Sequence, residues 1–392
     1  MRYLIFLLNA VLLLMPQVTG MNAQTLEIHP APVKGESARP PSEDEMARLP
    51  VVPLPVRSMK LIAPETGWVN TGSKILWTSD SGNTWKDISP ITPSATDSEN
   101  DTLFSSVFFL DRRTGWVVYH TDATDRDIAE YELHVALTTD GGASWTYTHI
   151  PQITPEVEMT GGGSLAFADR LHGWLDVGIM RTAGALFETS DGGHTWHRTT
   201  GDPGSGVSLT ASSGKDLWMS GGPPDYRLYV SHDGAKTVKE VHMTPPSNVQ
   251  ADSWPTYKDP IFLNSIIGYE EVTYEGEDDT DGMAVLFSTS NGGNTWKSER
   301  ILTHLEGITT GDRLNSAFAD STWMISSGKP NEPRTILKIP ANTGITDGSG
   351  THVKLHVCNL SFLTEHEGWR VCSGLESTQD GGKTWRDITP RF

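Results

Sequence analysis

The sequence has few cysteines, a deficit of basic residues and no long apolar stretch beyond its first residues. Its 392 residues include only two cysteines, Cys358 and Cys372, which excludes a disulfide-dense scaffold or a zinc protein with several cysteine ligands. Lysine and arginine number 30 against 49 aspartate and glutamate residues, so the formal net charge is −19. Nucleic-acid binding needs a basic surface that neutralises phosphates, so we expect no nucleic-acid partner.

The N-terminal residues have the composition of an export signal. Arg2 precedes an apolar run from Leu4 to Met15, and small residues follow as far as Ala23. This pattern predicts a signal peptide over residues 1–23, cleaved after Gly20 or Ala23, and the Pro-rich stretch 24–55 predicts a linker. No later segment has the roughly 18 consecutive apolar residues of a membrane helix. We therefore expect a secreted or periplasmic protein without a membrane span after cleavage.

Tryptophan is abundant, and an internal repeat accounts for most of it. The chain holds 13 Trp, more than its 9 Tyr or 11 Phe. The pattern [ST]-x-D-x-G-x-x-W occurs four times, at Thr78, Asp80, Gly82 and Trp85; Thr138, Asp140, Gly142 and Trp145; Thr189, Asp191, Gly193 and Trp196; and Thr378, Asp380, Gly382 and Trp385. Two degenerate copies are residues 231–238, with Ala235 and Val238 at the Gly and Trp positions, and Thr289, Asn291, Gly293 and Trp296. We call each copy a box.

Each box has the residues of a hairpin turn. Short β-type runs flank the boxes, as at Lys74–Trp77 and Trp85–Ile88. The Asp and Ser/Thr side chains can bond turn amides, Gly supplies a positive φ, and Trp can pack into the apolar space beneath. We therefore interpret the boxes as structural turn residues rather than ligand sites.

A second signature counts the repeats. Sequences related to F-x-[DN]-x-x-x-G-W end at aromatic residues about 50 positions apart, namely Trp68, Trp116, Trp174, Trp218, Tyr269, Trp323 and Trp369. A period near 50 suits four strands with their turns. The sequence therefore predicts an all-β domain at residues 56–392, a seven-bladed β-propeller of four-stranded antiparallel blades. The expected blades are roughly residues 56–95, 100–152, 160–201, 205–245, 255–303, 310–348 and 350–392, the sixth without a box.

These motifs carry a family resemblance. The box resembles the Asp-box, or BNR repeat, of sialidases and related propellers, and together with F-x-D-x-x-x-G-W it is most similar to the photosystem II stability/assembly factor-like propellers, over about residues 57–390. The resemblance implies a seven-bladed β-propeller, in agreement with the seven aromatic positions. It leaves the activity open, because Asp-boxes occur in hydrolases and in non-enzymatic scaffolds.

Acidic residues concentrate in two loops that we expect on the face opposite the boxes. The middle turns of blades 2 and 5 are the longest, and they hold Asp122, Asp125 and Asp127, and Glu275, Glu277, Asp278, Asp279 and Asp281; we count Glu270 and Glu271 with the second loop. This rim is a candidate surface for an unknown protein or another cationic partner. Calcium is an alternative ligand, and a third interpretation is that the charges only keep the protein soluble.

The remaining expectations concern the cysteines and the function. Cys358 and Cys372 flank a hairpin turn, so in an oxidising compartment we expect them to form a disulfide. We expect a monomeric, non-enzymatic scaffold without catalytic residues, bound metal or other cofactor. The alternatives are a genuine photosystem II assembly factor, which in the family binds a reaction-centre subunit, and a glycoside hydrolase whose paired carboxylates lie among the many acids.

Overall fold

The structure, a computed structural model, describes most of the chain after residue 53. The described residues are 54–91, 102–121, 132–150, 159–179, 184–201, 207–221, 227–247, 249, 255–274, 282–306, 315–327, 335–341, 353–354 and 358–391. The chain divides into two units, Met1–Pro50 and Val51–Phe392, and all described residues belong to the second. The expected signal peptide and nearly all of the expected linker lie outside them. Among the described residues no helix is long and apolar enough to cross a membrane.

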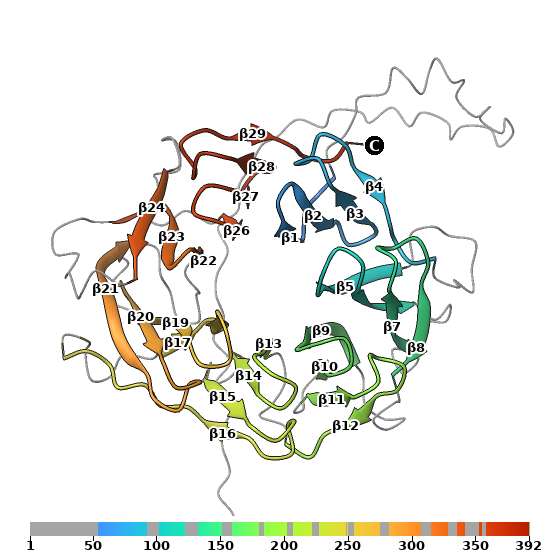
Figure 1. The fold of residues 1–392 in the computed structure, drawn as a ribbon, viewed down its shortest axis with the longest axis horizontal. Helices are drawn as coiled ribbons and strands as arrows, with labels where there is room; N and C mark the ends of the chain where they lie inside the picture. Colours follow the sequence, from blue (N-terminus) through green and yellow to red (C-terminus); the bar gives the residue numbers. More distant parts are fainter. Residues whose placement is uncertain are drawn as a thin grey trace, which may run out of the picture. The chain divides into compact units, whose positions relative to one another are not determined.

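The second unit is a seven-bladed β-propeller, which confirms the predicted fold (Figure 1). Five blades are antiparallel sheets of four strands in chain order. They are blade 1, with β1 (Ser58–Ala63), β2 (Thr66–Asn70), β3 (Ile75–Thr78) and β4 (Lys86–Asp87); blade 2, with β5 (Thr102–Phe109), β6 (Gly115–Thr121), β7 (Glu132–Thr138) and β8 (Thr146–His149); blade 3, with β9 (Met159–Phe167), β10 (Gly173–Ile179), β11 (Ala185–Thr189) and β12 (His197–Arg198); blade 4, with β13 (Ser208–Ala211), β14 (Leu217–Ser220), β15 (Leu228–Ser231) and β16 (Lys239–Glu240); and blade 7, with β26 (Asn359–Phe362), β27 (Gly368–Val371), β28 (Leu375–Thr378) and β29 (Arg386–Asp387). The first strand of each lies toward the centre of the ring and the last at its outside.

Blades 5 and 6 depart from this plan. In blade 5, β17 (Pro255–Tyr257) and β18 (Ile261–Phe262) both pair with β19 (Gly268–Tyr274), followed by β20 (Gly282–Thr289) and β21 (Lys297–Glu306). Blade 6 has three strands among the described residues, β22 (Ser316–Ala319), β23 (Thr322–Ser327) and β24 (Thr335–Pro340).

One short strand lies in a different sheet from the one we expected. We placed residues 350–392 in blade 7, but β25 (Val353–Lys354) pairs in parallel with Leu305 and Glu306 of β21 in blade 5. The outer edge of β21 presents backbone groups that need partners, and this segment bonds them. Only the residues from Asn359 onward form the blade 7 sheet.

The repeated aromatic residues form the core between blades. Trp116, Trp174, Trp218, Trp323 and Trp369 are among the largest fully buried side chains. Trp116 stacks on Phe167 of the next blade with ring centroids 3.5 Å apart, and the Trp369 ring lies 5.8 Å from the Trp85 ring of blade 1. Facing sheets of a propeller must fill a wide space between them, and large aromatic rings do so. The tryptophan excess therefore serves packing.

The ring closes through the same contact that joins neighbouring blades. The Trp145 indole Nε1 of blade 2 donates to the Ile88 carbonyl of blade 1 at 3.0 Å. Across the closure, the Trp85 Nε1 of blade 1 donates to the Ile388 carbonyl of blade 7, also at 3.0 Å. The Leu54 amide adds a 3.2 Å bond to the Pro390 carbonyl. All strands of blade 1 come from the N-terminal side and all of blade 7 from the C-terminal side, so closure needs no exchanged strand.

The structure confirms the predicted disulfide. Cys358 precedes β26 and Cys372 follows β27, and these strands pair so that Asn359 lies opposite Val371. The two sulfur atoms are bonded, with the Cα atoms 4.5 Å apart. The bridge ties the inner hairpin of blade 7.

Candidate functional site

The boxes share one hydrogen-bonded frame, seen clearly in blade 3. The Thr189 hydroxyl donates to Asp191 Oδ1 at 2.8 Å and accepts from the Gly193 amide at 2.9 Å. The Thr195 amide donates to Asp191 Oδ1 at 2.9 Å, and its hydroxyl donates to Oδ2 at 2.6 Å. Gly193 has a φ of 93°, which favours glycine. Both carboxylate oxygens thus serve the turn.

The pattern that we read from the sequence missed one member of this frame. The seventh box position, written as any residue, is a hydroxyl residue in all six boxes, namely Thr84, Ser144, Thr195, Thr237, Thr295 and Thr384. In the five boxes that carry an aspartate, this hydroxyl donates to the carboxylate. Aligning the six copies at this position would have revealed the signal.

The degenerate boxes keep the frame with different chemistry. In blade 4, Ala235 replaces glycine yet has a φ of 65°, and its amide donates to the Ser231 hydroxyl at 2.8 Å. In blade 5, Asn291 replaces aspartate: its Oδ1 accepts from the Thr295 amide at 3.0 Å, and its Nδ2 donates to the Thr295 hydroxyl at 2.8 Å. The blade 5 turn therefore has the same shape as the others but no charge.

The box frame also determines the acidity of its aspartates. Hydrogen bonds from the Thr84 side chain and amide lower the pKa of Asp80 to about 2, and Ser144 does the same for Asp140. A general acid near neutral pH needs a raised pKa. These carboxylates are therefore unsuited to donating a proton to a substrate.

In each blade that has a box, the first turn lies against that box. In six blades an amide of the box donates to a carbonyl of the first turn, as from Gly192 to Leu171 in blade 3 and from Gly292 to Ile266 in blade 5. A polar side chain closes the first turn itself; Asp169 Oδ1, for example, accepts from the amides of Leu171 and His172 at 2.7 and 2.8 Å. We call the surface formed by the first turns and the boxes the box face.

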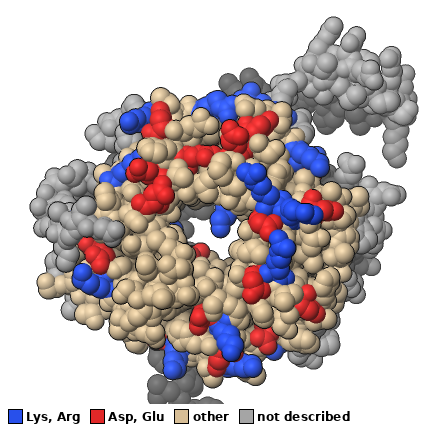
Figure 2. All heavy atoms as spheres, viewed as in Figure 1, with Lys and Arg blue, Asp and Glu red and all other residues tan. Residues whose placement is uncertain are grey.

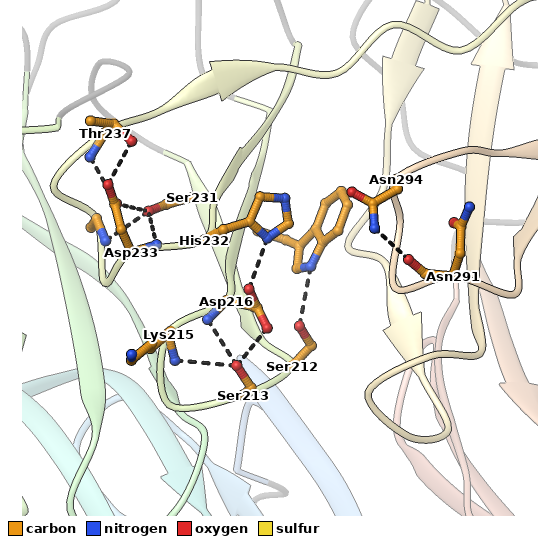
Figure 3. Close-up of polar contacts among 12 residues, drawn as sticks. Ser212, Ser213, Lys215, Asp216, Ser231, His232, Asp233, Thr237, Asn291 and Asn294 are labelled. Atoms are coloured by element: carbon orange, nitrogen blue, oxygen red, sulfur yellow. Dashed lines mark hydrogen bonds and ion pairs between the residues drawn. The ribbon is translucent and has the colours of Figure 1, made fainter.

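The box face of blade 4 carries a Ser–Asp–His cluster (Figure 3). Asp216 Oδ1 lies 2.8 Å from His232 Nδ1, and Asp216 Oδ2 accepts from the Ser213 hydroxyl at 2.6 Å. Ser213 also accepts from the amides of Lys215 and Asp216. Nucleophilic serine catalysis needs the histidine between serine and aspartate, whereas here the aspartate lies in the middle. The cluster therefore fastens the turn of blade 4 to its box.

Charged and hydroxyl side chains also join blades 4, 5 and 6 near the inner strands. Asp259 accepts from Ser208 Oγ at 2.6 Å and from Ser220 Oγ at 2.5 Å. Lys258 Nζ donates to the Ser316 carbonyl at 2.6 Å, and Trp323 Nε1 donates to Glu271 Oε2 at 2.7 Å. These bonds cross from blade to blade, so they hold the inner part of the ring together.

Two acids that we assigned to the loop of blade 5 lie elsewhere. Glu270 and Glu271 belong to β19 and are 1% and 5% exposed, so counting them as loop residues was wrong. A run of acids in sequence does not show where the strand ends, and Glu271 is bonded by Trp323 and Ser316 of the next blade. The other rim residues, Asp122, Asp125, Asp127, Glu275, Glu277, Asp278, Asp279 and Asp281, lie outside the described residues. Among the described residues no group of three or more side chains could hold a metal ion.

A cavity of about 470 Å³ opens where the ring closes. The boxes of blades 1 and 7 line it, with Asp80, Asn83, Trp385 and Arg386 among the residues. The Arg386 guanidinium donates to Asn83 Oδ1 and to the Ser81 carbonyl, so its charge fastens blade 7 to blade 1. Asp80, with both oxygens bonded in its turn, is likewise occupied.

The box face of blade 5 is uncharged and carries exposed aliphatic side chains. Ile261, the first residue of β18, and Leu263, Ile266 and Ile267, which follow this strand, are 37%, 51%, 54% and 39% exposed. Residues 261–268 and 289–296 contain no charged side chain. Figure 2 shows that the surface beside the central opening over β17, β19 and β20 is largely uncharged, whereas charged side chains are frequent over β1–β8. Exposed aliphatic residues close together in this way are a candidate interaction surface, and we call these four residues the aliphatic turn.

Comparison with known proteins supports the fold. No model of a known protein family matches the sequence, and no curated protein matches it. Among solved structures, the GH74 xyloglucanase from Xanthomonas campestris is similar over 87% of this chain and 54% of its own, with 12% identity and a TM-score of 0.56. An ancestral GH74 enzyme is similar over 86% of this chain and 47% of its own, with 14% identity and a TM-score of 0.51.

A third structure, described as YCF48 bound to D1 peptide, covers 76% of this chain and 88% of its own, with 16% identity and a TM-score of 0.41. This chain spans about half the length of each of the two GH74 enzymes. At 12% and 14% identity, the likeness to the two GH74 enzymes shows the propeller fold alone.

Proposed function

We propose that this chain is a non-enzymatic β-propeller scaffold that binds another protein through the box face of blade 5. The observation that carries the proposal is the aliphatic turn, in which four of the seven exposed large hydrophobic side chains of the described residues occur together. Burying such side chains against a partner lowers the free energy of the complex, because apolar surface is removed from contact with water. Scattered exposed leucines need no such explanation, but this cluster does.

The chemistry of Asp80, a box aspartate that lines the ring-closing cavity, suits a structural role better than that of the proton donor of a hydrolase. Glycoside hydrolysis needs two carboxyl groups, one of them with a raised pKa that lets it protonate the leaving group. Asp80, in the ring-closing cavity, has its pKa lowered to about 2 by Thr84. It is held as an ionised turn residue.

The disulfide supports the expected export of the chain. Disulfides form and persist in oxidising compartments outside the cytosol. The Cys358–Cys372 bridge suits a secreted or periplasmic protein. The acidic rim stays a second candidate surface for a cationic partner.

The scaffold proposal can be tested with L263S/I266S, which makes the aliphatic turn polar. The chain is immobilised and used to capture proteins from an extracellular or periplasmic extract. The amount of captured protein should be at least tenfold lower for this variant than for the unchanged chain. The matched control is L171S, because Leu171 is a lone leucine, 53% exposed, in the corresponding turn of blade 3. If L263S/I266S and the unchanged chain captured equal amounts, the aliphatic turn would not be the binding surface. Hydrolysis of sialosides or β-glucans by the chain would overturn the non-enzymatic assignment.

A further inference from the structure

Blade 5 lacks both of the carboxylates that its repeat positions hold in blade 3. Asn264 stands where the first turn of blade 3 has Asp169, and Asn291 stands where its box has Asp191. Both asparagines lie in the two segments that form the box face of this blade, next to the aliphatic turn. The two changes therefore remove charge from one local surface.

The replacements leave the turn geometry intact. Asn264 Oδ1 accepts from the amides of Ile266 and Ile267 at 2.9 Å each, as Asp169 does from Leu171 and His172. Asn291 Oδ1 accepts from the Thr289 hydroxyl at 2.9 Å and from the Thr295 amide at 3.0 Å, as Asp191 does in its own box. The turns do not need the asparagines for their shape, so the difference lies in charge.

An uncharged surface matters where a partner excludes water. A carboxylate covered by an apolar partner loses its hydration at a large free-energy cost, whereas a hydrogen-bonded amide loses much less. In the neighbouring blade 4, the Asp216 carboxylate is bonded to its own blade, with Oδ1 2.8 Å from His232 Nδ1 (Figure 3). We infer that the aliphatic turn of blade 5 binds a short, uncharged, apolar segment of a partner protein, a conclusion that rests on the proposed function and specifies its partner.

The size of the surface favours a single segment over a second copy of this chain. A stable protein–protein interface uses about 20–30 residues on each side. The aliphatic turn has only four side chains, a number suited to contacting one face of an amphipathic helix in the partner. Such a helix presents apolar residues at positions i, i+3, i+4 and i+7. A net charge of −19 on each copy also opposes self-association.

The test uses a defined probe, a neutral helical peptide with leucines at i, i+3, i+4 and i+7 and serine or glutamine between them. The isoleucine methyl signals of the full chain are followed by NMR, with a peptide of the same composition in scrambled order as the reference. We expect saturable shifts at Ile266 and Ile267 with the helical peptide only. Its affinity should fall at least tenfold in N264D/N291D, which introduces the two carboxylates that blade 3 has at these positions.

The matched control is D169N/D191N, which makes the same exchange in reverse on blade 3 and should leave affinity unchanged. Thermal melts establish that both variants fold. Unchanged affinity in N264D/N291D, or no methyl shift in the unmodified chain, overturns the inference. So does partition of the chain onto zwitterionic phosphatidylcholine vesicles through the same residues, or a dimer in sedimentation that L263S/I266S abolishes. Loss of natural partners in L263S/I266S without peptide binding would leave the proposed function standing and refute the inference alone.

Discussion

The box faces of blades 3 and 5 share the same hydrogen-bonded turns but differ in surface chemistry. In both, an oxygen of an Asp or Asn side chain closes the first turn, and a Thr–x–Asp/Asn–x–Gly frame closes the box. Blade 3 exposes Asp169 and Arg170 beside Leu171 in its first turn, whereas blade 5 exposes Ile266 and Ile267 there without a charged neighbour in the turn. The frame therefore specifies the shape of a turn and leaves its surface chemistry free to vary.

This separation explains how a repeat protein acquires a binding surface. Only a few side chains of each box make the bonds that all six boxes share, and the residue types at the intervening positions vary. A blade can change those positions without losing its turn. We predict that mutations in the frame affect stability and that mutations between frame positions affect binding.

The largest expected difference concerns the glycine of the box. A Cβ at Gly193 would have the Trp116 Nε1 as its nearest neighbour at 3.2 Å, but at Gly293 it would overlap the Trp218 ring. Both glycines have positive φ, 93° and 86°. G193A should cost about 1 kcal/mol from backbone strain, and G293A about 3 kcal/mol because crowding adds to that strain. Urea unfolding of the two variants measures the difference, and equal losses would contradict it.

A smaller difference is expected at the seventh box position. The Thr195 hydroxyl donates to a carboxylate at 2.6 Å, whereas the Thr295 hydroxyl accepts from a neutral amide at 2.8 Å. Charge-assisted hydrogen bonds are the stronger kind, so T195A should cost about 1 kcal/mol at pH 7 and T295A about 0.5 kcal/mol.

This second difference should depend on pH. Burial raises the pKa of Asp191, but hydrogen bonds from Thr195 and Thr189 outweigh it and lower the pKa to about 2. In the unfolded chain the pKa is near 3.9. A lowered folded pKa stabilises the protein above about pH 4, and this contribution is lost as the pH falls toward 2. T195A and T295A should therefore converge in acid unfolding experiments, and a gap that persists at pH 2 would refute the charge explanation.

The smallest effect is expected in blade 4, whose box already has alanine at the glycine position. Ala235 is buried with a φ of 65°. A235G should relieve about 1 kcal/mol of strain, offset by the lost methyl group and by the greater freedom of glycine in the unfolded chain. The stability in urea should change by less than about 0.5 kcal/mol, and a larger change would show that the frame of blade 4 differs from that of blade 3.

Much of the fold could be predicted because it follows local patterns. The spacing of Trp116, Trp174 and Trp218 indicated one blade each, and Cys358 and Cys372 flank a single hairpin. The placement of Glu270 and Glu271 failed for the opposite reason. Acids at the end of a run look like loop residues, and only the partners that they meet in the next blade show that they are buried in β19. The pairing of β25 with blade 5 likewise depends on segments about 50 residues apart.

The candidate surface was hidden from the sequence for a related reason. Ile261, Leu263, Ile266 and Ile267 sit in a β-type stretch whose aliphatic residues are typical of a core strand. Their exposure follows from the turn that ends β18 and from the box of the same blade that lies against it. In the sequence Asn291 only marks a degenerate box and Asn264 fits the F-x-[DN] signature, and the structure shows that the two segments lie against each other.

The amino-acid sequence alone determined the seven blades, the turn frame and the disulfide, because each is set by residues close together in the chain and repeated along it. The exposure of the aliphatic turn, the burial of Glu270 and Glu271 and the closure of the ring were settled only by the folded structure. These features depend on which residues meet across blades, as Trp85 meets Ile388, and contacts between such distant segments leave no local pattern.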